Sequence, residues 1–357
     1  MRIETPLISV LVDTYNHERY IEQALVSVLE QGWPPAELEI IVVDDGSTDR
    51  TPEIVRKFVP RVKHVRKKNG GQASAFNAGF AETRGEIVTI LDGDDWWAKG
   101  KLAAVAEALE KNPEVAAAGH GYYEFHEESG ESKVHVPEQR KMELSSVEAA
   151  RAALRNWRFL LMGALAVRRK LLERIMPLPE AMTFSADNPI QFAAMAMGAV
   201  LLEEPLSYYR IHDRNLYEIG LEDTGKLRRK YEMTDLVLRY SYGMLLKLGV
   251  AEECVSELLM ENWLQTRRTR LRQFGGRRVH TLQAEMKGFQ LASRNPGLAY
   301  RFYKYAVMGT ATLLLPPRQF YRLKDWYARK QMGRYRDLVF KAEGAPPALP
   351  GKPSERI

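Results

Sequence analysis

Residues 86–97 have the sequence EIVTILDGDDWW. An apolar run rich in β-branched residues ends in three carboxylates within four positions, Asp92, Asp94 and Asp95, and two tryptophans follow. Like charges crowded where a buried strand reaches the surface repel one another unless a cation, or a polyanion bound through one, sits over them. The stretch therefore predicts the end of a buried strand and a site for a charged ligand.

The chain before this stretch alternates between strand and helix patterns. Continuous apolar runs at 7–14 and 38–45 are typical of parallel strands buried on both faces. Between them, Ile21, Leu25 and Val28 recur at helical spacing. We expect strands at 7–14, 38–45, 61–67 and 86–92 and helices within 17–31, 46–59 and 71–85, the second helix capped by Ser47 or Thr48 with Pro52 in its first turn. Such alternation predicts an α/β fold with right-handed crossovers.

Polar clusters follow the carboxyl ends of three predicted strands, at Asp13–Asn16, Asp44–Ser47 and Asp92–Asp95. In an open α/β sheet, ligands bind at that edge. The first strand is followed neither by G-x-G-x-x-G nor by G-x-x-x-x-G-K-[ST], so neither a dinucleotide site nor a bare-phosphate loop is predicted. Carboxylates are hard oxygen ligands, and together with the oxygens of a diphosphate they suit Mg²⁺ or Mn²⁺.

Four segments together resemble the motifs of one enzyme family. PLISVLVDTYNHERYIEQALVSVLEQ, EIIVVDDGSTDRT, NGGQASAFNAGF and GEIVTILDGDDWW are similar, in order and spacing, to the motifs of family 2 glycosyltransferases. The similarity continues more weakly to about residue 215. It implies a GT-A fold, with a Rossmann-like, mostly parallel sheet flanked by helices. It also implies an inverting transfer of a sugar from a nucleotide diphosphate sugar, most often a UDP-sugar.

The resemblance also implies roles for individual residues in the first hundred positions. One departure is Asp13, which stands where the family usually has proline, so the entrance of the nucleotide pocket is expected to differ. By the resemblance, Thr14, Tyr15 and Asn16 line the nucleotide pocket, Asp44 and Asp45 contact base or ribose, Gln72 and Asn77 lie near nucleotide or sugar, Asp92 faces the ribose, and Asp94 holds the metal on the diphosphate. Structural roles are the alternatives to these contacts. Tyr15 would then pack against its neighbours, and Gln72 and Asn77 would cap a helix or form a turn.

The second half of the predicted catalytic domain supplies a candidate base. Asp187 comes just before an amphipathic helix, where family members carry Glu-Asp, and here Ala186 replaces the flanking acid. An inverting displacement needs a carboxylate to take the proton of the acceptor hydroxyl, and the metal offsets charge growing on the leaving diphosphate. By the resemblance, Asp187 is that base; taken alone, an Asp before a helix is more often an N-cap.

A further segment, YYRIHDRN at 208–215, is similar to a recurring family segment. It implies that His212 is a second metal ligand or touches the diphosphate, and that Arg210 pairs with phosphate. A structural, hydrogen-bonded histidine is the alternative for His212.

The C-terminal part of the chain is strongly basic, unlike the part before it. Residues 264–341 contain 18 Lys and Arg against 3 Asp and Glu, whereas residues 1–263 contain 32 against 41. The uncharged run at 305–317 is too short to span a bilayer, but its basic and aromatic flanks suit an anionic membrane surface. A helix packed on the catalytic domain is the alternative. Nucleic acid is not expected, since no recognition motif accompanies the charge.

These features predict a domain plan and a location. We expect a catalytic domain at 1–215, with nucleotide-sugar binding in 1–100 and the acceptor and base half in 101–215. A helical basic extension at 216–341 and a disordered tail at 342–357 follow. The single cysteine, Cys254, fits a reducing compartment, and the N-terminus lacks the features of a signal peptide. The predicted location is cytoplasmic, peripheral at the inner face of the membrane.

Three readings of the function compete. The first is transfer of a sugar to a hydroxyl of a glycan or lipid-linked acceptor. The second is transfer to a polyprenyl phosphate, which needs no strong base because that acceptor is already an anion; the acid at Asp187 favours the first. The third is a catalytically silent protein that binds nucleotide sugars or acts as a membrane scaffold.

Overall fold

The computed structural model describes residues 7–138, 140–212, 224–292 and 310–324. The chain divides into two compact units, residues 1–263 and 264–357. The domain boundary expected after residue 215 stays a prediction. The tail at 342–357, and the part of the uncharged run before residue 310, lie outside the described residues.

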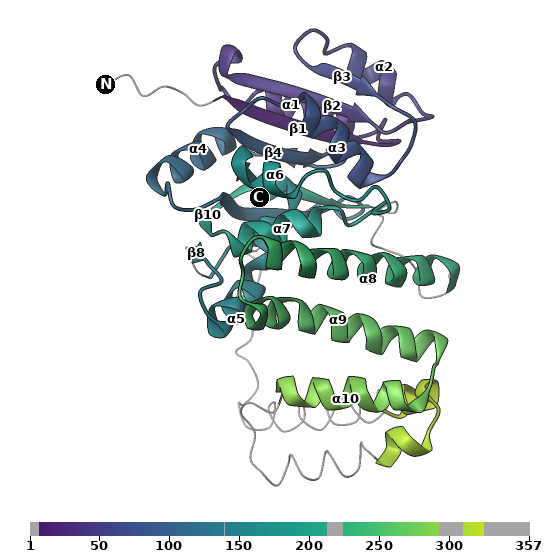
Figure 1. Ribbon diagram of the computed structural model, residues 1–357. Helices are drawn as coiled ribbons and strands as arrows, with labels where there is room; N and C mark the ends of the chain where they lie inside the picture. The colour runs from purple at the N-terminus through teal and green to yellow at the C-terminus, as the bar shows by residue number, and fades with distance from the viewer. Residues whose placement is uncertain (1–6, 139, 213–223, 293–309, 325–357) are drawn as a thin grey trace, which may run out of the picture. The chain divides into compact units, whose positions relative to one another are not determined.

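A mixed sheet forms the centre of the first unit. The strand order among the described residues is β3-β2-β1-β4-β9-β6-β10-β5, with β7 paired to β6 and β8 paired to β10 (Figure 1). The first four strands are parallel, as the alternation of strands and helices predicts, whereas β9 lies antiparallel between β4 and β6. The strands are β1 (Ile8–Thr14), β2 (Leu38–Asp44), β3 (Lys63–Arg66), β4 (Ile87–Asp92), β5 (Trp96–Trp97), β6 (Ala117–His126), β7 (Glu131–His135), β8 (Lys141–Met142), β9 (Ala166–Arg168) and β10 (Ala199–Ile211).

Helices cover both faces of this sheet. In β1, Val10 and Val12 belong to one hydrophobic cluster and Leu11 to another, because successive side chains of a strand point to opposite faces. The cluster around Val10 includes residues of α1 (Ile21–Leu29), α2 (Thr51–Arg56) and α4 (Lys101–Lys111). The cluster around Leu11 includes residues of α3 (Gln72–Glu82), α5 (Val147–Asn156), α6 (Arg169–Ile175) and α7 (Asp187–Ala196). We call this second face the α3/α7 face.

Three long helices follow the sheet. Val237 and Leu245 of α8 (Thr224–Lys247) and Leu258 of α9 (Glu252–Phe274) are buried in the same cluster as α7. In the second unit, the end of α9, α10 (Arg278–Ala292) and helical residues within 310–324 enclose a small cluster of their own, made of Leu264, Leu271, Ala284, Phe320 and Tyr321. None of the helices in the described ranges is long and apolar enough to cross a membrane.

One local expectation needs correction, and one strand is shorter than its neighbours. Helix α2 is not capped by Ser47 or Thr48, because Asn16 and Asp44 hold those residues. Instead Asp49 Oδ1 accepts the N–H of Thr51 at 2.9 Å. Strand β9 is short and covers only Ala166–Arg168. The residues before it form two short 3₁₀ turns, Trp157–Leu160 and Met162–Ala164, and the carbonyl of Gly163 accepts a hydrogen bond from the buried ammonium of Lys101 at 2.6 Å.

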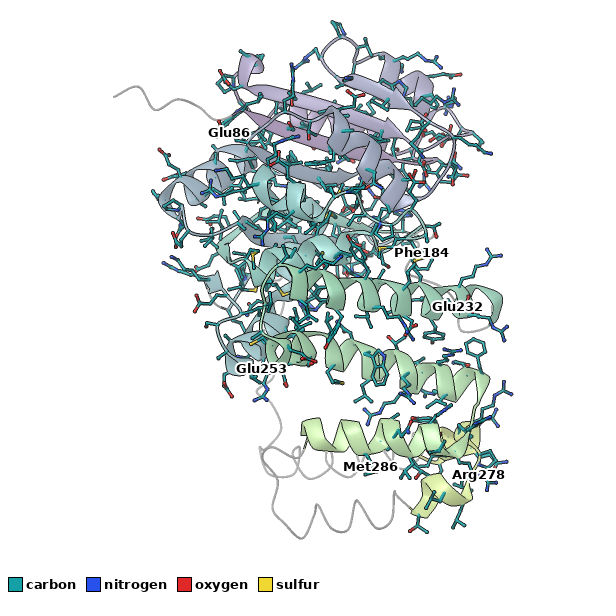
Figure 2. All side chains as sticks on the ribbon, in the orientation of Figure 1. Glu86, Phe184, Glu232, Glu253, Arg278 and Met286 are labelled. Atoms are coloured by element: carbon teal, nitrogen blue, oxygen red, sulfur yellow. The ribbon has the colours of Figure 1, made fainter. Side chains whose placement is uncertain are left out.

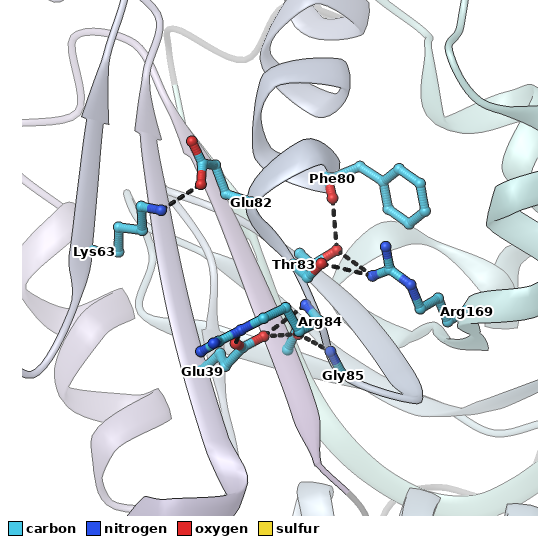
Figure 3. A network of polar contacts seen from close by, with 9 residues as sticks. Glu39, Lys63, Phe80, Glu82, Thr83, Arg84, Gly85 and Arg169 are labelled. Carbon is cyan, nitrogen blue, oxygen red and sulfur yellow. Dashed lines mark hydrogen bonds and ion pairs between the residues drawn. The ribbon is translucent and has the colours of Figure 1, made fainter.

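A polar network fixes the end of the sheet opposite the acidic clusters (Figure 3). Arg169, the first residue of α6, donates to the carbonyl of Thr83 at 2.8 Å and to its hydroxyl at 2.9 Å. Arg84 donates its backbone N–H and its guanidinium to Glu39 on β2, and Lys63 on β3 pairs with Glu82. The C-terminal end of α3 is therefore joined to β2, β3 and α6.

Candidate active site

The predicted acidic clusters meet at one edge of the sheet. The strand register pairs Asp13 of β1 with Asp92 of β4, and Thr14 of β1 with Asp44 of β2. The N–H of Gly93 donates to the Asp13 carbonyl at 2.9 Å. A side chain at position 93 would lie 2.7 Å from the Thr14 hydroxyl, so only glycine fits this close approach.

Asp13 and Asp92 form a carboxyl pair on the α3/α7 face. Burial raises the pKa of Asp13 to about 7, and the charges of Asp94 and Asp187 add to the rise. A hydrogen bond with Asp92 lowers the pKa but does not outweigh the burial. Burial, and then the charge of Asp13, raise the pKa of Asp92 well above its ordinary value. Two half-buried carboxyls in contact cannot both ionise without cost, so the pair favours holding one proton. The acid that replaces the family's proline thus contacts the expected ribose residue.

Asp94, two residues after Asp92, lies between two histidines. Its Oδ2 is 3.1 Å from Nε2 of His212 and 3.8 Å from Nε2 of His17. Burial alone would raise the pKa of Asp94, but the charge of His17 and the hydrogen bond from His212 outweigh it and hold the pKa below its usual value. The structure brings together the two expected metal ligands. His17 lies beside the same carboxylate.

Asp95 and Arg210 support the turn rather than facing outward. Asp95 Oδ1 accepts the N–H of Arg210 at 2.8 Å, and the guanidinium of Arg210 donates to the Asp94 carbonyl at 2.8 Å and to Gln23 at 2.6 Å. The same guanidinium stacks over Trp96 at 4.4 Å from the ring centroid. Arg210 is thus enclosed by protein groups, and its expected pairing with phosphate stays a prediction.

The residues expected around the nucleotide follow β1 and β2. Tyr15 is exposed, while Asn16 has a left-handed backbone (φ 57°), and its side-chain oxygen accepts the N–H of Thr48 at 2.8 Å. Asp44 is buried and accepts the N–H of Ser47 at 2.7 Å. Asp45 accepts hydrogen bonds from Lys67 at 2.6 Å and from the N–H of Gly71 at 2.7 Å.

Gln72 and Asn77 lie on α3 and bind backbone groups of the loop before α7. Oε1 of Gln72 accepts the N–H of Ala186 at 2.8 Å. Asn77 exchanges two hydrogen bonds with the backbone of Leu178, both 2.8 Å long. Both amides therefore hold a loop, and their expected place beside nucleotide or sugar stays a prediction.

Asp187 is the first residue of α7, after Ala186, whose side chain makes no cap hydrogen bond. Its Oδ2 accepts a hydrogen bond from Gln191, one turn along the helix, at 2.8 Å. Burial raises the pKa of Asp187 to about 6. Hydrogen bonds from backbone N–H groups and from Gln191 lower this pKa but do not outweigh the burial. Its charge raises the pKa of Asp13 and Asp92, so the candidate base shares a site with the strand-end acids. A carboxylate with such a pKa is suited to accept a proton near neutral pH.

A divalent cation fits the donor set at Asp94 in part. Within the described ranges, no group of three or more His, Cys, Asp and Glu is placed to hold a metal ion. Asp94 and His212 offer one carboxylate and one imidazole in contact. Mg²⁺ and Mn²⁺ are commonly held by one or two protein groups, with substrate phosphates and water completing the shell. The pair suits a cation that arrives with a diphosphate.

Comparison with known proteins bears on this arrangement. The family model named Glycosyl transferase family 2 matches residues 9–176. An uncharacterised glycosyltransferase of Nostoc sp. is 32% identical over 260 residues, which are 68% of this chain and 79% of that protein. The chain belongs to glycosyltransferase family 2. This family 2 member is therefore a glycosyltransferase, as its motifs predict.

Solved structures agree on the fold. TarS of Staphylococcus aureus, residues 1–349 in complex with UDP, superposes with a TM-score of 0.60 at 20% identity, over 89% of this chain and 91% of that one. A mannosyltransferase of Pyrobaculum calidifontis, in complex with GDP-Man and Mn²⁺, superposes with a TM-score of 0.51 at 23% identity, over 89% and 84%. The expected GT-A fold with a helical C-terminal region is confirmed.

Proposed function

We propose that this family 2 glycosyltransferase moves a sugar from a nucleotide diphosphate sugar to a hydroxyl of a glycan or lipid-linked acceptor, with inversion. The observation that carries the proposal is the convergence of the half-buried carboxyl of Asp187 with the strand-end acids Asp13 and Asp92 in one site. A donor needs recognition groups at the sheet edge, and an acceptor hydroxyl needs a base. The site offers both.

Each side chain then has a defined task. Asp44 and Asp45 shape the pocket for base and ribose, and Asp92 faces the ribose. Asp187 accepts the proton of the acceptor hydroxyl as that oxygen attacks the sugar carbon and the diphosphate departs. Gln191 holds one oxygen of Asp187 and so fixes the direction of the carboxylate.

Asp94 and His212 would hold the divalent cation, Mg²⁺ or Mn²⁺. When bound, that cation offsets negative charge on the leaving diphosphate. The Mn²⁺ named with the Pyrobaculum mannosyltransferase supports this part of the proposal.

A UDP-sugar is the donor class that we favour. TarS of Staphylococcus aureus has a solved complex with UDP and another with UDP-GlcNAc, the latter with a TM-score of 0.55 at 19% identity over 89% of this chain and 92% of that one. A polyprenyl phosphate acceptor is less favoured, because that acceptor is already an anion and does not need the half-buried Asp187 carboxylate, whose pKa is raised, as a base.

Calorimetry tests the donor site. We would titrate UDP, GDP, TDP and CMP, each with and without Mn²⁺, into wild type and Asp94→Ala. We expect one nucleoside diphosphate to bind with a dependence on Mn²⁺ that the substitution removes. If a folded wild-type protein bound none of the four nucleotides, the hypothesis of a catalytically silent scaffold protein would replace the proposal.

We also infer that the second unit attaches the enzyme to an anionic membrane surface. Its described residues, 264–292 and 310–324, include ten Lys and Arg and one acid, Glu285, which pairs with Arg268 and Lys324. Leu313, Leu314 and Leu323 are 54%, 68% and 48% exposed, and the exposed Arg318 and Arg322 lie in the same segment. Met286 on α10, labelled in Figure 2, is also exposed. Exposed aliphatic groups among arginines suit an interface of anionic lipid.

Vesicle flotation tests this attachment. The protein should float with phosphatidylcholine vesicles that contain phosphatidylserine but not with phosphatidylcholine alone. Leu313→Asp combined with Leu314→Asp should abolish flotation, while Val134→Asp, at an exposed valine of the first unit, should not. Equal flotation of all three proteins would contradict the inference.

A further inference from the structure

Helix α3 connects the nucleotide side of the site to the loop that carries Asp187. Its first backbone amides are already occupied by that loop: the N–H of Gln72 donates to the carbonyl of Thr183 at 3.0 Å, and that of Ala73 to the carbonyl of Met182 at 3.1 Å. The helix N-terminus, often an anion site, here binds protein carbonyls. The contacts at this end of α3 therefore serve the loop.

The two amide side chains of α3 fasten the loop at both of its ends. Asn77 binds both backbone groups of Leu178, where the loop begins, and Gln72 accepts the N–H of Ala186, where it ends. Ala186 directly precedes Asp187. A shift of that peptide would therefore move the first turn of α7 and the carboxylate with it.

The helix itself is well anchored, so it can act as a fixed reference. Phe76 and Ala73 are fully buried. The far end of α3 is joined to α6 through Thr83 and Arg169 (Figure 3). Since α6 leads directly into the loop, both approaches to Asp187 are tied to the same helix.

The turn before α3 touches both sides of the site. Gly71 donates its N–H to Asp45 at 2.7 Å, and a Cβ at Gly71 would lie 2.5 Å from Cα of Thr183. The loop thus packs directly on the backbone that binds Asp45. Phe184, half-buried in the same loop, is labelled in Figure 2.

We propose that Gln72 and Asn77 are positioning residues that hold the 178–186 loop, and with it the Asp187 carboxylate, rather than groups that bind the donor. The inference rests on the proposed function, because it assigns the two amides to the base of that reaction. Catalysis is sensitive to such placement, and a shift of about 1 Å costs up to about 100-fold in rate.

Matched variants at position 72 test the proposal. Gln72→Met has a similar length and no acceptor for the Ala186 N–H, whereas Gln72→Glu keeps that acceptor. Glu82→Gln, at an exposed position of the same helix, controls for effects on α3 as a whole. Asn77→Leu removes the second attachment.

Hydrogen exchange and nucleotide binding are measured first. In Gln72→Met we expect the Ala186 amide to exchange about 10-fold faster, and in Asn77→Leu the Leu178 amide, because each loses its acceptor. Calorimetric affinity for UDP should stay within about twofold of wild type in both. With UDP-GlcNAc as probe donor, the kcat for release of UDP should fall about 10- to 100-fold in Gln72→Met and Asn77→Leu, with KM unchanged. Gln72→Glu should keep most of the wild-type kcat.

The opposite pattern would overturn the proposal. UDP affinity reduced 10-fold or more with unchanged loop exchange would make these amides donor contacts. Failure of the proposed function looks different: wild type would bind none of the four nucleotides. The exchange difference between Gln72→Met and Gln72→Glu would then still decide whether the loop is held as stated.

Discussion

Replacing Asp187 with asparagine should make the enzyme slower and the fold more stable. Burial raises the pKa of this carboxyl from its ordinary value of 3.8 to about 6. At about 1.4 kcal/mol per unit, keeping it ionised in the folded state costs up to about 3 kcal/mol at pH 8. Because the side chain is only partly shielded from solvent, we expect the gain in Asp187→Asn to be about 1–3 kcal/mol.

The pH dependence of that gain follows from the direction of the shift. A carboxyl with a raised folded-state pKa favours the fold below pH 4, and this contribution is lost as the pH rises through about 6. The stability difference between Asp187→Asn and wild type should therefore be largest at pH 8 and become small near pH 4. Urea unfolding at the two pH values measures it.

Turnover provides the second half of the test. Loss of a general base costs about 10²- to 10⁴-fold, whereas UDP affinity should be nearly unchanged, because asparagine keeps an oxygen for Gln191. Release of nucleoside diphosphate from the bound donor reports the rate. A rate within 10-fold of wild type, or equal stability at pH 8, would refute the reasoning.

Three further outcomes are expected. The wild-type rate should rise about tenfold per pH unit below pH 6 and level off above it, because Asp187 acts as a base only when ionised. Initial rates from pH 4.5 to 8 measure this dependence. A rate that is flat across this range would exclude that role. Asp94→Asn, or EDTA treatment of wild type, should weaken nucleotide binding at least about 10-fold, since Asp94 is the carboxylate proposed to hold the cation. Calorimetry measures the affinity. Unchanged affinity in both cases would argue against a cation there. Gly71→Ala should destabilise the fold by about 2 kcal/mol or more in urea, because its φ of 83° and its contact with Thr183 both oppose a side chain. Gly100→Ala, with a φ of 86° and open space around it, should cost only about 1 kcal/mol, and an equal loss in the two variants would contradict the contact.

Local patterns were enough to predict the framework of this fold. The apolar runs of β1, β2 and β4 and the helical spacing in α1 are properties of neighbouring residues, so they can be read without knowing the rest of the chain. The order of strands and helices then places the polar clusters at one edge, because parallel strands share their carboxyl end. In this way the sequence predicted that the clusters with Asp13, Asp44 and Asp92 share one edge. Which residues are paired, Asp13 with Asp92 and Thr14 with Asp44, depends on the strand order in the structure.

The partners of individual side chains could be found only from the tertiary structure. Gln72 contacts Ala186, 114 positions away, and Asn77 contacts Leu178, 101 positions away. His17 lies beside Asp94 because the loop after β1 and the turn after β4 converge, and the guanidinium of Arg210 turns back onto Trp96. Local periodicity determines which face of an element is apolar. Which polar groups meet depends on the paths of loops whose conformation is set by packing between segments far apart in the chain.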